Sequence, residues 1–240
     1  PTDAAKVLAT AYLVQGYMFH FAPEQQACFY CFGESDAVTF MTELLGSAMM
    51  ATGVASSCKL FFGTDLNTAL GYWSLLSSAS CLRWWLNKTH SKAGMSNGAM
   101  AAIAAISAIG AFAGLTNQEW TPSLFKAYIA FFSLSSIYTI LAPEASGNAW
   151  GIDAKDDEKL KLLARGQGHF LLASELQNLL LIQGTEPGKA LAYVSFSALV
   201  HQIYVLFISR KAITVAKPSG YQFWLTFTTT CIAFILGKQA

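Results

Sequence analysis

Eight apolar segments separated by short polar stretches dominate the hydrophobicity pattern of the chain. They cover residues 4–22, 37–62, 66–87, 95–115, 122–142, 160–183, 188–209 and 219–237. Most are near the ~20 residues that a helix needs to cross a hydrocarbon core. In lipid only helices and closed barrels satisfy the backbone. The pattern therefore predicts an all-α integral membrane protein with about eight transmembrane helices.

The same sequence signals appear twice along the chain. Residues 22–24, Ala-Pro-Glu, recur at 142–144, and residues 69–72, Ala-Leu-Gly-Tyr, recur as Ala-Leu-Ala-Tyr at 190–193. The offset is about 120 residues, half of the chain. A repeat of this length sets the architecture, so we expect two four-helix bundles, residues 1–118 and 119–240, related by a pseudo-twofold axis along the membrane normal. This parallel arrangement disfavours a transporter built from inverted repeats.

Two segments have an alternative interpretation. Segment 4–22 contains Lys6, Gln15 and His20, and segment 37–62 is interrupted by Glu43. Either could be an interfacial or re-entrant helix. The repeat favours a crossing for 4–22, because its counterpart 122–142 is more apolar.

Composition supports a lipid environment. The chain is 54% apolar and 12% charged, whereas soluble domains carry roughly 25% charged residues. The formal charge of +1 gives no indication of nucleic acid as a partner. The 17 Phe and 6 Trp suit a lipid-facing surface with interfacial belts.

The distribution of basic residues predicts an orientation. With an even number of spans both termini lie on one face of the membrane, here called side A. Loops 23–36, 88–94, 143–159 and 210–218 then lie on the opposite face, side B. Side B holds most of the bases, which favours the cytoplasmic or equivalent compartment: Arg83, Lys88, Lys92, Lys155, Lys159, Lys161, Arg165, Arg210, Lys211 and Lys217.

Ionisable residues inside the apolar segments are the first candidates for function. Glu43 and Arg83 fall at similar depth near side B on consecutive helices. The favoured interpretation is a structural ion pair, and a proton or quinone-headgroup site is the alternative.

Two histidines are the candidate cofactor ligands. His169 and His201 fall near mid-membrane on consecutive helices, and the first repeat has Ser80 in place of His201. They could be hydrogen-bonded core residues, axial ligands of a chlorophyll magnesium or a haem iron, or parts of a redox or proton relay. Possible supporting residues for such a site are Glu175, Gln177, Asn178 and Gln202. His20 and His90 are expected to be solvated.

Cys28 and Cys31 form a Cys-x-x-Cys sequence on side B. A disulfide or reactive dithiol and an unpaired structural pair are both consistent with it. No second Cys-x-x-Cys completes a metal site, and no catalytic motif is present. We therefore assign no catalytic residue and no metal site.

One repeat consists of a helix ending at proline, a polar loop with glycine, a helix with a mid-span glycine and two further helices. The residues that carry this pattern are Pro23, Gly33, Gly46 and Gly71, with Pro143, Gly151 and Gly166 in the second copy. The pattern resembles the DoxX-like group of four-helix membrane proteins, here as two fused copies. The resemblance implies a quinone- or thiol-linked membrane oxidoreductase component, and it carries over no catalytic residue.

Three function classes remain: a non-catalytic subunit of a large membrane assembly, a DoxX-like oxidoreductase component, and a small-molecule transporter. Aromatic-rich helices and the lack of a catalytic set favour the first. Mid-membrane His, Gln and Asn with many aromatic residues favour a photosystem-type subunit that binds chlorophyll, carotenoid and lipid. Its partners would be membrane lipids and other integral subunits, without nucleic acid. Its expected location is the chloroplast thylakoid membrane, with the mitochondrial inner membrane as the alternative.

Overall fold

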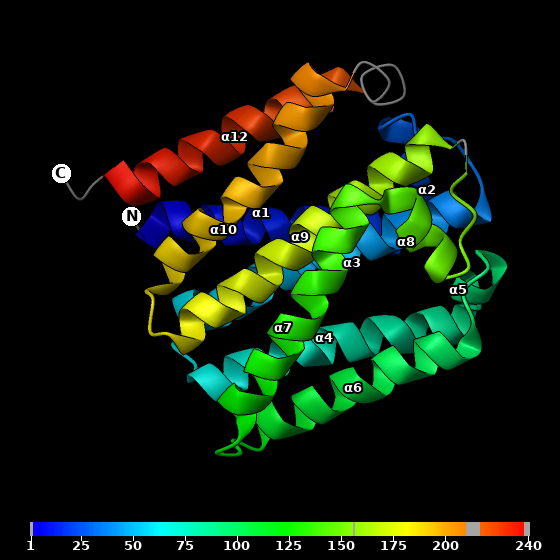
Figure 1. Ribbon diagram of the computed structural model, residues 1–240. Helices are drawn as coiled ribbons and strands as arrows, with labels where there is room; N and C mark the ends of the chain where they lie inside the picture. The colour runs from blue at the N-terminus through cyan, green and yellow to red at the C-terminus, as the bar shows by residue number, and fades with distance from the viewer. Residues whose placement is uncertain (1, 156, 210–216, 238–240) are drawn as a thin grey trace.

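The computed structural model describes residues 2–155, 157–209 and 217–237 (Figure 1). Every regular element in these residues is a helix. In chain order they are α1 (Thr2–Phe21), α2 (Pro23–Phe29), α3 (Asp36–Phe62), α4 (Leu66–Asn87), α5 (Thr89–Lys92), α6 (Asn97–Leu115), α7 (Thr121–Leu141), α8 (Pro143–Ala149), α9 (Glu158–Ile182), α10 (Pro187–Ile203), the π-helix η1 (Tyr204–Ile208) and α12 (Pro218–Leu236). The predicted all-α class is confirmed.

The long helices coincide with the apolar segments of the sequence, with ends that differ by no more than two residues when α10 is taken together with η1. Four of them are long and apolar enough to cross a membrane: α3, α6, α7 and the continuous stretch Pro187–Ile208. The fold is therefore compatible with a membrane protein.

Local capping chemistry explains where the helices begin. Ser35, Asp65, Ser96 and Asp157 each precede a long helix, and each side-chain oxygen accepts a hydrogen bond from a first-turn backbone N–H. These bonds satisfy N–H groups that the helix itself leaves unpaired. The short helices α2 and α8 begin at proline, a residue that is well tolerated at the first helical position.

Two helices form the centre of the molecule. α3 packs against α9, α1 packs on α3, and α7 packs on α9. The pairs α4–α6 and α10–α12 flank this centre on opposite sides (Figure 1). α1 and α3 approach closely because Gly16 and Gly46 face each other, and a Cβ on either would lie 2.6 Å from the carbonyl oxygen of the other. Small residues at such crossings are typical of helix packing in membranes.

The outer faces of several helices are apolar. Within the most apolar 18-residue stretch of α7 only 22% of the residues are buried in the protein, whereas 72% are buried in the corresponding stretch of α3. On α7 the side chains of Phe131, Leu134 and Leu141 are exposed by 66%, 70% and 75%. Apolar faces of this kind need lipid or another protein to cover them.

The two ends of the helix bundle differ in character. α1 begins and α12 ends at the same end, and the short helices α2, α5 and α8 lie at the opposite one (Figure 1). These ends correspond to sides A and B of the sequence analysis. Of the basic residues assigned to side B, Arg210 and Lys211 lie outside the described residues.

The expectation that His20 and His90 are solvated is wrong, because each is only 1% exposed. His20 Nδ1 lies 3.1 Å from the backbone oxygen of Glu43. α5, which contains His90, packs against α3. The Nδ1 atom of His90 lies 2.9 Å from the carbonyl oxygen of Trp84 in the last turn of α4.

Candidate functional site

The ion pair expected from the sequence is present at side B. Arg83 Nη1 donates to Glu43 Oε1 at 2.8 Å, and the Glu43 side chain is 2% exposed while that of Arg83 is 24% exposed. The Arg83 guanidinium also lies over the Phe21 ring at 5.1 Å, within range of a cation–π interaction. Arg83 of α4 thus contacts both α3 and α1 at their side-B ends.

His169 and His201 lie next to each other, with ring centroids 5.4 Å apart. His169 Nδ1 lies 3.1 Å from Ser197 Oγ, whereas His201 Nδ1 has no hydrogen-bond partner among the described residues. His201 Nε2 faces Gly166, where even an added Cβ would lie at only 3.1 Å. A tetrapyrrole bound at Nε2 would require α9 and α10 to separate, so this packing does not favour the predicted ligand role.

The other predicted cofactor residues, Asn178 and Gln202, are buried but do not hydrogen-bond the histidines. Both polar atoms of the Asn178 amide and the Gln202 Oε1 atom lack partners in the described part of the chain. Gln177 donates instead to Ser56 Oγ at 2.6 Å. Among the described residues these side chains therefore make no hydrogen bond that would orient either imidazole ring.

Cys28 and Cys31 are both exposed free thiols on side B. Cys28 is in the last turn of α2, and Cys31 follows that helix with a φ of 64°. The pair thus lies at the C-terminal end of a short helix, whereas reactive thiols are found at helix N-termini.

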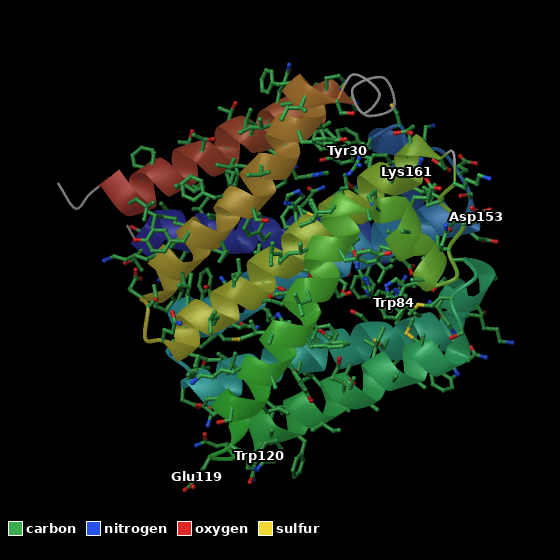
Figure 2. The ribbon with its side chains drawn as sticks, in the orientation of Figure 1. Tyr30, Trp84, Glu119, Trp120, Asp153 and Lys161 are labelled. Carbon is green, nitrogen blue, oxygen red and sulfur yellow. The ribbon has the colours of Figure 1, made fainter. Side chains whose placement is uncertain are left out.

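A cavity of about 170 Å³ lies between α3, α4, α6, α7 and α9, and residues of α8 and its following loop close its side-B end. Its wall is mainly aromatic and aliphatic, with rings contributed by Phe40, Trp73, Trp84, Tyr128, Phe132 and Trp150. Trp84 is in the side-B half of α4, toward the end where Asp153 lies, and Trp120 is at the opposite end of the molecule (Figure 2). The cavity therefore extends from the middle of the helix bundle toward side B.

Polar groups also line this wall, and two of them are Glu175 and Ser74. Glu175 is 2% exposed, and its two carboxyl oxygens lie 3.3 and 3.4 Å from Ser136 Oγ. Ser74 is fully buried, and its hydroxyl has no hydrogen-bond partner in the described structure. The Ser74 Oγ fits beside Gly110, where a Cβ would lie only 2.5 Å away. A buried carboxyl group and a free hydroxyl group thus line the same apolar cavity.

Sequence reasoning treated Glu175 only as a neighbour of His169 and so missed its position in the cavity. A signal was available, because Glu175 lies seven residues inside the side-A end of an otherwise apolar segment. An ionisable group at such a depth is itself a candidate for function.

No protein-family model, curated protein or solved structure matches the chain.

Proposed function

We propose that the chain is an integral membrane protein whose eight long helices all cross the bilayer as two four-helix repeats. The packing of the helices supports this, because α1 on α3 has a counterpart in α7 on α9, and the pair α4–α6 has one in α10–α12. The loops after α2 and α8 also correspond, since Gly33 and Gly151 have φ values of 87° and 85°. The repeats are not separate bundles, because α3 packs on α9 and α1 contacts α12.

The proposed function of this protein is to hold one mainly apolar molecule in the cavity between α3, α4, α6, α7 and α9. The observation that carries the proposal is the cavity itself, whose volume is about 170 Å³. An apolar protein cavity of ~150 Å³ binds benzene, so this one accommodates a ring-sized group. Well-formed apolar pockets with a few convergent polar groups are the usual form of small-molecule sites.

The exposed helix faces fit a subunit that associates with other membrane proteins. We place the chain in the class of non-catalytic subunits of a large, photosynthetic-type assembly in a thylakoid membrane, with a mitochondrial inner-membrane assembly as the alternative. In this proposal part of a lipid-like molecule occupies the cavity, and no chlorophyll is bound at His201. The reason is that the cavity offers apolar space, while His201 Nε2 faces Gly166.

The experiment is to purify the full chain in mild detergent, record its absorption spectrum, and identify co-purifying molecules by solvent extraction and mass spectrometry. Ser77→Leu would fill part of the cavity, because Ser77 lines it. The matched control is Thr229→Leu, on an exposed face of α12. We expect one bound molecule in the wild type and the control, and less in Ser77→Leu. Equal content in all three proteins, or none in any, would contradict the proposed function.

A further inference from the structure

We infer that the molecule held in the cavity carries a single positive charge at one end, which pairs with Glu175; its chemical class is a lipophilic amine or quaternary ammonium compound. This inference rests on the proposed function. It adds that the bound molecule, although mainly apolar, ends in a cationic group.

The first argument is charge. Among the described residues that line the cavity, Glu175 is the single acidic one, and the wall they form contains no Lys, Arg or His. No ion pair of Glu175 occurs in the described parts of the chain, where the buried Glu43 by contrast is paired with Arg83. A buried carboxylate is costly unless it is paired. A cationic ligand next to Glu175 favours the ionised form of its carboxyl group, because the two opposite charges then pair.

The second argument is the surrounding aromatic wall. Trp73, Tyr128 and Phe132 line the cavity together with Glu175, and the faces of such rings attract cations. Trp73 is 7% exposed and so presents its ring within the protein rather than to lipid. A carboxyl group among aromatic rings recognises an organic cation, whereas a neutral polyene would need only the rings.

The third argument is the position of the polar groups. At ~1.5 Å per residue, Ser74, Ser107 and Glu175 each lie roughly 10–13 Å along their helices from the side-A ends. Toward side B the wall contains the buried apolar residues Met95, Met100 and Ile152, and the hydroxyl groups of Thr139 and Ser146 there hydrogen-bond each other at 2.7 Å. The hydroxyl groups toward side B thus have partners within the protein, whereas Glu175 has no cationic one among the described residues, which matches an amphiphile whose small charged head lies at Glu175.

The experiment uses two probes of the same shape, benzyltrimethylammonium and neopentylbenzene. Neopentylbenzene has a neutral carbon where benzyltrimethylammonium has its positively charged nitrogen. Binding to the purified full chain is followed by quenching of tryptophan fluorescence and by the rise in the unfolding temperature, both plotted against free probe concentration. The proteins compared are the wild type, Glu175→Gln, and the control Glu144→Gln. Glu144 is on side B, where its exposed carboxylate pairs with Lys161 at 3.1 Å.

We expect Glu175→Gln to weaken binding of benzyltrimethylammonium about tenfold or more, because the charge pair is lost. Binding of neopentylbenzene should stay within about twofold in all three proteins. Should Glu175→Gln fail to fold, Phe132→Leu serves as a second variant, since loss of the ring should weaken the cation more than its neutral analogue.

Equal affinity of the two probes for the wild type, with Glu175→Gln leaving both unchanged, would overturn the inference while the cavity still bound ligand. Failure of both probes to bind, together with no difference in co-purified molecules between the wild type and Ser77→Leu, would overturn the proposed function as well.

Discussion

Gly94 and Gly151 touch backbone to backbone, although they belong to loops that are 57 residues apart in the sequence. Both have positive φ angles, 103° and 85°, and a Cβ on either residue would collide with the carbonyl oxygen of the other. The residues that follow them, Met95 and Ile152, line the cavity. This contact therefore closes the side-B end of the cavity by joining the loop before α6 to the loop after α8.

We predict that Gly94→Ala and Gly151→Ala destabilise the protein and open the side-B end of the cavity. An alanine in the left-handed backbone conformation lowers the stability of the folded state by ~1–2 kcal/mol. At these two positions the added Cβ also collides with the other loop. Gly184→Ala is the matched control, because Gly184 has a φ of 84° but nothing within 4 Å of an added Cβ. Thermal unfolding in detergent should show a larger loss for the first two variants. A loss no greater than that of Gly184→Ala would contradict the proposed closure.

The Glu43–Arg83 pair gives a prediction about stability. Arg83→Met leaves the buried Glu43 carboxylate without its partner, and breaking a buried pair in this way costs about 3–5 kcal/mol. Because Arg83 is 24% exposed, we expect the lower end of that range. The double variant Glu43→Gln with Arg83→Met should recover part of the loss, since no charge is then left unpaired. Additive losses in the double-mutant cycle would show that the two residues act independently.

Asp65 at side A gives a prediction about pH. The hydrogen bonds from the Thr68 hydroxyl, at 2.6 Å, and from the Thr68 backbone N–H, at 2.9 Å, lower the pKa of the Asp65 carboxyl group. Its contribution to stability is thus present above the pKa of the unfolded chain and is lost as the pH falls through the lower pKa of the folded state. Asp65→Ala should cost about 1 kcal/mol at neutral pH.

Measurement of the unfolding temperature of the wild type and of Asp65→Ala as a function of pH checks this. The difference between them should shrink on acidification below the ordinary range of aspartate. Asp65→Asn keeps a capping oxygen and should lose less than the alanine variant. A constant difference at all pH values would mean that the carboxylate charge is not involved.

His201→Leu tests whether this residue holds a cofactor. Since His201 Nδ1 is buried without a partner among the described residues, replacement by an apolar side chain of similar size removes an unsatisfied group. We expect an unfolding temperature equal to or above that of the wild type, and an unchanged content of co-purified molecules. Loss of one chlorophyll equivalent from the absorption spectrum would restore the tetrapyrrole interpretation.

The sequence predicted the helices well because the signals that set their ends are local. Ser35, Asp65 and Ser96 each begin a helix by accepting a hydrogen bond from the backbone N–H three residues later. Such a bond depends only on neighbouring residues, so it forms independently of how the helices pack. The pairing of Glu43 with Arg83 was also accessible, because the two residues lie on consecutive antiparallel helices at similar depth.

The sequence by itself thus determined the all-α class, the approximate bounds of the long helices and the apolar character of their side chains. Tertiary structure alone decided which polar groups meet. It buried His20 and His90, and it brought Glu175 to Ser136, 39 residues away. In a water-soluble helix the polar face marks the outside, but in lipid both faces are apolar, so periodicity does not reveal which face points inward. The position of Glu175 in the cavity depends on that choice of face, which only the packing of α7 against α9 makes.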